Sequence, residues 1–61
     1  MANTFIYGPK DGAPVPAILW ILPSIELLET TKDGKFVHRY TLNDEDNNYH
    51  YVGVVREENN D

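Results

Sequence analysis

Two histidines and ten carboxylates are the side chains from which a metal or catalytic site would have to be built, because the chain has no cysteine. The segment 43–48 (NDEDNN) offers oxygen ligands of the kind that calcium prefers. An EF-hand loop also needs a glycine at its sixth position and an acid at its twelfth. Counted from Asp44, these positions hold Tyr49 and Val55. We therefore predict a solvated loop, with weak cation or small-ligand binding as an alternative.

The two histidines are expected on neighbouring strands but on opposite faces, so His38 and His50 cannot share a metal ion. One histidine alone provides too few ligands for zinc. His38 is expected to pair with Glu29, which would form half of a catalytic dyad. Ser24 or a threonine would then have to be the nucleophile, and no oxyanion donor can be identified. We predict a partly buried, hydrogen-bonded pair, and no enzyme, cofactor or metal site.

The strands that would position these residues start with a central hairpin, 35–42 and 49–55. In both segments β-branched and aromatic residues alternate with other residues, which is typical of strands, and the six residues between them are polar. Pairing Leu42 with Tyr49 gives one apolar face, on which cross-strand aromatic pairs are stabilising. The same register pairs Tyr40 with Tyr51 and His38 with Gly53.

A second hairpin is predicted at the Asp-Gly pair 33–34, which follows the expected strand 25–31. Asp-Gly between two strand-like segments is a strong signal for a two-residue type I′ turn. Such a turn places Glu29 opposite His38, on the apolar face that the central hairpin also selects. The competing interpretation is a helix over 23–31 with proline at its first position.

The first part of the chain adds two expected strands. Residues 4–7 (TFIY) are followed by a strong turn signal at 8–12, where proline presets φ and glycine allows a positive φ. Residues 17–22 (AILWIL) are entirely apolar and stand between prolines. Such a run is either a strand buried on both faces or a short buried helix, and its length favours the strand.

These segments together predict an all-β fold. We expect a small antiparallel meander of four to five strands (4–7, 16–22, 25–31, 35–42 and 49–55) that curls toward an SH3-like barrel or a small sandwich. Residues 1–56 would form one domain and 57–61 a disordered acidic tail. A chain this short buries only about 60% of its unfolded surface, so we expect marginal stability.

Two short motifs resemble those of small uncharacterised bacterial and phage proteins. Those proteins open with a strand and a Gly-Gly-Pro-x-Asp-Gly turn, and they close with a Tyr-x-Tyr-x-Gly strand. The matching residues here are Gly8, Pro9, Asp11, Gly12, Tyr49, Tyr51 and Gly53, with Tyr7 where the first glycine would stand. The resemblance covers both ends of the chain and not the middle. It implies a small all-β domain and brings no activity with it.

The net charge of −5 is concentrated at the end of the chain. Residues 1–43 hold four acids and four bases, whereas residues 44–61 hold six acids and one base. This distribution argues against nucleic acid and anionic membranes as partners, since both need clustered Lys and Arg. No apolar run approaches the roughly 18 residues of a membrane span, and the first residues lack the features of a signal peptide. We expect a cytoplasmic protein.

The apolar segment 17–22 suggests the function. A strand that is apolar on both faces needs cover on both, and a 61-residue chain has little left to provide it. We therefore predict a non-enzymatic protein-interaction module that self-associates as a homodimer or binds another protein, with Trp20 near the centre of the interface. Closure into a compact barrel, in which the chain covers itself, is the alternative to self-association. The alternative is a phage-type inhibitor that mimics an acidic partner through residues 44–46 and 57–61. The predicted interface residues are Ile18, Trp20, Leu22, Leu28, Val37, Val52 and Val54.

Overall fold

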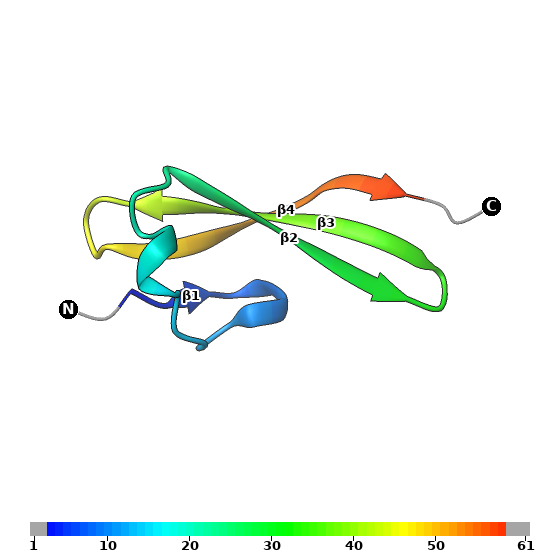
Figure 1. Ribbon diagram of the computed structural model, residues 1–61, viewed down its shortest axis with the longest axis horizontal. Coiled ribbons are helices and arrows are strands. Elements are labelled where there is room, and N and C mark those ends of the chain that lie inside the picture. The colour runs from blue at the N-terminus through cyan, green and yellow to red at the C-terminus, as the bar shows by residue number, and fades with distance from the viewer. Residues whose placement is uncertain (1–2, 59–61) are drawn as a thin grey trace.

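Four strands form one open, mixed sheet in a computed structural model that describes residues 3–58 (Figure 1). The elements are β1 (Phe5–Ile6), the 3-10 helices η1 (Gly8–Lys10) and η2 (Ala17–Leu19), β2 (Ser24–Thr31), β3 (Gly34–Asn43) and β4 (Asn48–Glu58). The order across the sheet is β1-β4-β3-β2. The predicted all-β class is confirmed. Closure into a barrel or sandwich is not confirmed, because the sheet is open.

The first strand departs from the predicted antiparallel meander. β1 pairs in parallel with β4, so that Phe5 lies opposite Tyr49, whereas β2, β3 and β4 form antiparallel pairs. β1 and β2 lie at opposite edges of the sheet. Segment 8–23, which connects them, crosses from one edge to the other and so allows β1 to lie beside β4. None of the helices in the described part of the chain has the length and apolar character that crossing a bilayer would need.

The β3–β4 hairpin has the predicted register only near its connecting loop, where Tyr40 lies opposite Tyr51. Beyond Tyr40 the register shifts twice, each time by one additional residue in β4. The predicted pairing of His38 with Gly53 is therefore wrong, and His38 lies opposite Val54. Gly53 has a φ of +139°, which other residues rarely adopt, and so it accommodates the first of these bulges.

The β2–β3 hairpin is present, and the competing helix over 23–31 is wrong. The two loop residues are Lys32 and Asp33, and neither has the positive φ of a type I′ turn, so that turn type is also wrong. The hydroxyl of Thr31 accepts a hydrogen bond from the Asp33 amide (3.2 Å) and donates one to the Gly34 carbonyl (3.1 Å). With this loop, the pairing of β2 with β3 differs from the predicted pairing by two residues. A shift of two residues leaves the same side chains on the apolar face.

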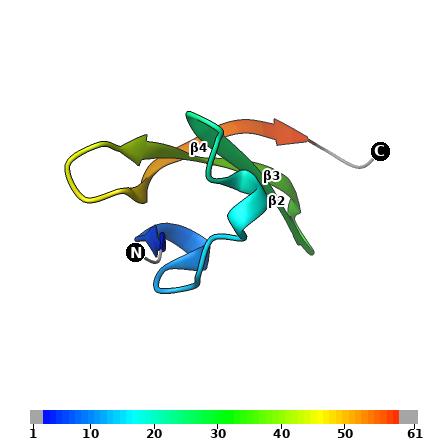
Figure 2. The same cartoon turned by 60° about the vertical axis from the view of Figure 1, so that its left-hand side comes forward.

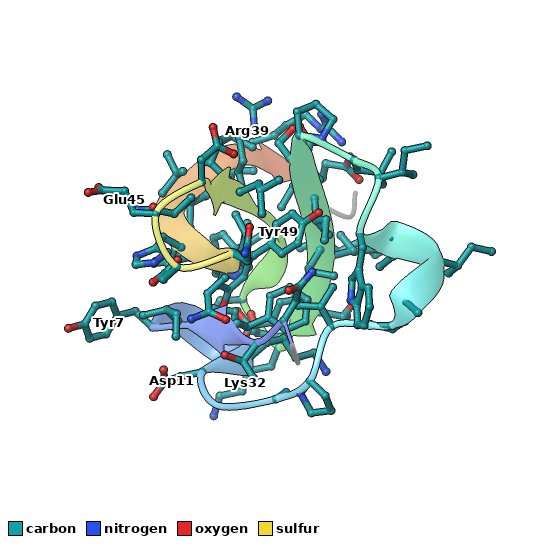
Figure 3. The ribbon with its side chains drawn as sticks, turned by 90° about the vertical axis from the view of Figure 1, so that its left-hand side faces the viewer. Tyr7, Asp11, Lys32, Arg39, Glu45 and Tyr49 are labelled. Carbon is teal, nitrogen blue, oxygen red and sulfur yellow. The ribbon has the colours of Figure 1, made fainter. Side chains whose placement is uncertain are left out.

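The N-terminal segment folds back on itself and covers one face of the sheet (Figure 2). Thr4 bridges Pro14, and the Phe5 amide donates to the Ala13 carbonyl at 2.9 Å. The core lies between this segment and one face of the sheet. Arg39 lies on the other face, and its side chain points outward (Figure 3). The buried core cluster consists of Phe5, Val15, Ile25, Tyr40 and Tyr49.

The turn at 8–12 is confirmed, and a buried tyrosine holds it in place. Tyr40 has no exposed surface; its hydroxyl donates to the Tyr7 carbonyl at 2.7 Å and accepts from the Lys10 amide at 3.0 Å. Gly8 lies between Tyr7 and Lys10 and has a φ of +69°. A Cβ atom there would collide with the Tyr40 hydroxyl and the Tyr51 ring. The turn therefore depends on a glycine at this position.

The predicted strand over 16–22 is wrong. Residues 17–19 form η2, in which the Leu19 amide donates to the Pro16 carbonyl (2.9 Å) and the Trp20 amide to the Ala17 carbonyl (3.1 Å). The buried Tyr49 hydroxyl lies 2.7 Å from the Leu22 carbonyl oxygen, which anchors the end of this segment. Local hydrogen bonds thus satisfy the backbone of an apolar run that has no neighbouring strand to pair with.

The last strand is longer than predicted. β4 continues through Glu57 and Glu58, which lie opposite Phe36 and Lys35. The sequence predicts a disordered tail that includes these two glutamates, and both are strand residues. The rest of that tail, residues 59–61, lies outside the described residues.

Candidate functional site

Large apolar side chains at the surface are the most prominent feature of the described residues. Six of the seven predicted interface residues are exposed, and Val37 is buried, with 4% of its surface accessible. Val37 lies on the central strand between Leu28 and Arg56, whose side chains flank it on both sides. The exposed predicted residues are Ile18, Trp20, Leu22, Leu28, Val52 and Val54.

One group of exposed apolar side chains belongs to η2 and the turn after it. Ile18 is 83% exposed and Ile21 87%, so both project from the body of the protein. Trp20 is held in place because its indole N–H donates to the Val15 carbonyl at 2.7 Å. Ile21 is not among the predicted interface residues, because a strand over 16–22 would turn its side chain toward the core.

A second exposed feature is the outer edge of β2. In an antiparallel pair, residues alternate between those hydrogen-bonded to the neighbouring strand and those whose backbone groups point away. The Leu42 amide donates to the Pro23 carbonyl at 3.0 Å. The odd-numbered residues of β2 therefore form the hydrogen-bonded pairs with β3. The even-numbered residues therefore direct their N–H and C=O groups outward; they are Ser24, Glu26, Leu28 and Thr30.

The other side of the sheet does not offer an equivalent edge. β1 covers the start of β4, and its own outer side is occupied by residues 13–15. The remainder of β4 contains two bulges, which interrupt a regular row of backbone groups. β2 has no register shift along its eight residues, so it is the long, regular open edge in the described part of the chain.

The charged side chains of β2 already have partners in the same chain. An oxygen of Glu26 accepts a hydrogen bond from Arg39 at 2.7 Å, and this bond lowers the pKa of the Glu26 carboxyl. Oε1 of Glu29 lies 3.0 Å from Nε2 of His38, so the predicted pair of these two residues is present. They contact each other diagonally across the strands, because the residue directly opposite Glu29 is Phe36.

The imidazole of His38 lies between two hydrogen-bonding groups and is almost completely buried. An ionised carboxylate can only accept, so Nε2 donates to Glu29 at 3.0 Å, and Nδ1 lies 2.8 Å from the Tyr51 hydroxyl oxygen. Both ring nitrogens are thereby occupied. The arrangement connects β2, β3 and β4 through side chains, which is a structural role.

A small pocket of about 190 Å³ opens beside this group. Ligand sites commonly have volumes of roughly 300–1,000 Å³, so this pocket has room for a side chain or a small ion. Three consecutive residues of β2 contribute to its wall, and the pocket is therefore continuous with the open edge. The lining residues are Pro9, Lys10, Leu27, Leu28, Glu29 and His38.

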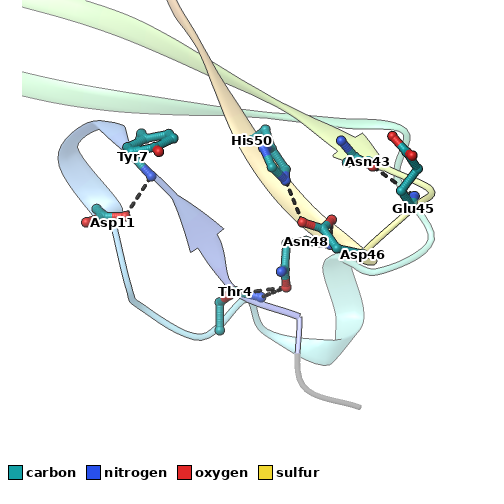
Figure 4. A network of polar contacts seen from close by, with 8 residues as sticks. All are labelled: Thr4, Tyr7, Asp11, Asn43, Glu45, Asp46, Asn48 and His50. Carbon is teal, nitrogen blue, oxygen red and sulfur yellow. Dashed lines mark hydrogen bonds and ion pairs between the residues drawn. The ribbon is translucent and has the colours of Figure 1, made fainter.

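The acidic loop between β3 and β4 is held by its own hydrogen bonds (Figure 4). Asp46 accepts from the Asn48 amide at 3.0 Å and pairs with Nε2 of His50 at 2.8 Å, and these interactions lower its pKa. The Asn43 side chain accepts from the Glu45 amide at 2.8 Å. Within residues 3–58 no three histidine or acidic side chains gather in a way that could hold a metal ion.

The two acidic segments do not share a surface. The loop containing residues 44–46 lies at one end of the molecule, and Glu57 and Glu58 lie toward the other (Figure 1). The molecule is elongated, with extents of 42 × 19 × 18 Å. An acidic mimic that uses both segments would therefore have to contact its target at two separated places.

Comparisons with protein-family models, with curated proteins and with solved structures found no match for this chain. Any statement about its function therefore rests on the residues and the geometry described above.

Proposed function

We propose that this chain is a non-enzymatic protein-interaction module and that it binds a second copy of itself. The observation that carries this proposal is the imbalance between its core and its surface. In the described part of the chain six apolar residues are buried, whereas nine large ones are exposed. Contiguous exposed apolar patches commonly mark interaction sites, and Ile18, Trp20, Ile21 and Leu22 are exposed within five consecutive residues.

The energetics support association. Full burial of a large aliphatic side chain contributes roughly 1.5–3 kcal/mol, and Ile18, Ile21 and Leu28 are each at least 60% exposed. A core of this size rarely supplies more than about 3–5 kcal/mol. Covering a few of these side chains would therefore offset several kcal/mol of the cost of association. Two-fold homodimers are the commonest way in which a single chain achieves this.

Sedimentation equilibrium across the micromolar range tests the proposal. We expect the average mass to rise with concentration from 7.0 kDa, the mass of one chain, toward twice that value. High salt should leave this association intact, because apolar burial does not weaken with ionic strength as exposed charge pairs do. A mass that stays at one chain at every concentration would contradict self-association.

The same experiment separates the acidic-mimic alternative. A chain that works through residues 44–46 and 57–61 would remain a monomer, and a complex with a basic protein would weaken steeply as salt is added. The internal hydrogen bonds of Asp46 and the separation of the two acidic segments favour the apolar route.

A further inference from the structure

We propose that the second copy adds to the open edge of β2, so that two β2 strands pair antiparallel across a two-fold axis that passes beside Leu28. This inference rests on the proposed self-association and specifies its contact. Strand addition satisfies backbone groups that an open edge leaves to water, and it is a common mode of protein recognition. Two four-stranded sheets would become one continuous sheet.

The backbone of β2 determines which pairs can form. Since only even-numbered residues direct their N–H and C=O groups outward, every hydrogen-bonded pair across the axis joins two of them. A register centred on Glu26 or Glu29 would set like charges directly opposite each other, which is destabilising. A register centred on Leu27 joins only Glu26 and Leu28 unless Ser24 also pairs, and η2 lies beside that end of the strand (Figure 3).

The register centred on Leu28 avoids both problems. Leu28 then lies opposite Leu28 of the second copy, and Glu26 lies opposite Thr30, which makes about six new backbone hydrogen bonds. Leu28 is the most exposed apolar residue of β2, with 60% of its surface accessible, and this pairing covers it. Registers centred nearer either end of the strand pair fewer residues.

Charge complementarity favours a second copy over an unrelated basic strand. Glu26 is already paired with Arg39 of its own chain, whereas the partner of the Glu29 carboxylate is the ring of His38. In the Leu28-centred register, Glu29 of the second copy lies opposite Leu27, at the mouth of the pocket that Lys10 lines. Lys10 makes no ion pair within the described residues and is available for this carboxylate.

Single cysteines test the register directly, because the chain has none of its own. Directly opposite residues of a hydrogen-bonded pair have Cα atoms about 5.5 Å apart, within the range of about 4.4–6.8 Å that a disulfide needs. Leu28→Cys should therefore form a disulfide-linked dimer when oxidised glutathione is added. The matched control is Thr30→Cys on the same exposed edge, where a four-residue offset separates the two sulfurs by roughly 13 Å.

We expect Leu28→Cys to cross-link at least about tenfold faster than Thr30→Cys, a difference of about 1.4 kcal/mol in barrier. If the wild type dimerises but the two variants cross-link equally slowly, this register is wrong and the proposed self-association stands. If the wild type is monomeric throughout, both proposals are overturned.

A second pair of variants measures the edge without cysteine chemistry. Leu28→Lys places two ammonium groups opposite each other at the axis, and we expect the dimer dissociation constant to rise by at least about tenfold. Tyr7→Lys introduces the same charge at a residue that is 70% exposed and follows β1, at the far edge of the sheet, and it should leave the constant within about threefold of the wild type. Equal effects of the two changes would overturn the edge contact. Both residues are more than half exposed, so both variants are expected to fold.

Discussion

Gly8 is the position at which one added methyl group should destabilise the fold most. A Cβ atom there would lie 2.5 Å from the Tyr40 hydroxyl oxygen and 2.5 Å from Cδ1 of Tyr51. Real Cβ atoms do not approach other atoms this closely, so the neighbouring rings or the turn would have to shift. Tyr40 has no exposed surface and its hydroxyl makes two hydrogen bonds to the turn, so a shift disturbs the core.

Two terms contribute to the expected loss for Gly8→Ala. A left-handed backbone conformation costs a residue with a side chain about 1–2 kcal/mol, and overpacking a buried site adds about 1–3 kcal/mol. We expect the free energy of unfolding to fall by about 2–5 kcal/mol. Because a core of this size supplies about 3–5 kcal/mol in total, much of the variant should be unfolded.

Gly12→Ala is the matched control, because it carries the backbone term without the collision. Gly12 has a φ of +84°, and nothing lies within 4 Å of a Cβ built there. Urea unfolding followed by Trp20 fluorescence measures both variants, at one fixed protein concentration so that association contributes equally. If both variants lose the same stability to within about 0.5 kcal/mol, Tyr40 and Tyr51 do not close over Gly8.

Three further predictions concern pH and the β2–β3 turn. Burial raises the pKa of Tyr40, so the stabilising contribution of its neutral hydroxyl is present below about pH 10 and is lost as pH rises through the pKa of the folded state. Tyr40→Phe should therefore flatten the fall of the urea unfolding midpoint at alkaline pH. A fall identical to that of the wild type would contradict this. The Asn48 amide and the His50 ring lower the pKa of Asp46, so its contribution is present above about pH 4 and is lost as pH falls through the folded value. Asp46→Asn should therefore reduce the acid-induced loss of stability, and an acid titration identical to that of the wild type would refute this. Gly34 has a φ of +141°, so Gly34→Val should cost more than about 1 kcal/mol in thermal unfolding, and an equal Tm would show that the turn tolerates a side chain.

Local chemistry made the hairpins predictable. The alternation of 35–42 and 49–55, the polar loop between them and the Asp-Gly pair at 33–34 are all short-range signals, and both hairpins are present. Two details were not predictable in the same way. The loop at Lys32 and Asp33 moves the pairing by two residues, and an alternating pattern fits both registers equally well. The bulges in β4 each insert one residue, which an alternating pattern does not indicate.

The exposed surface was predicted from apolar composition, although for a different structure. Ile18, Trp20 and Leu22 were expected on a strand, and they are exposed on a 3-10 helix and the turn that follows it. Val37 was expected at the surface with them. It is buried because it lies on the central strand between flanking side chains, and strand order is not written in any single segment.

By itself, the sequence determined the apolar face of each hairpin, the turn at 8–12 and the absence of any thiol, since these depend on residue type and near neighbours. Only the tertiary structure decided how the segment 17–22 folds. An apolar run between prolines is compatible with a strand or a helix, and the choice depends on whether a strand is available to pair with it. The open edge of β2 was decided at the same level, because it exists only once β3 has taken one side of β2 and nothing within residues 3–58 pairs with the other.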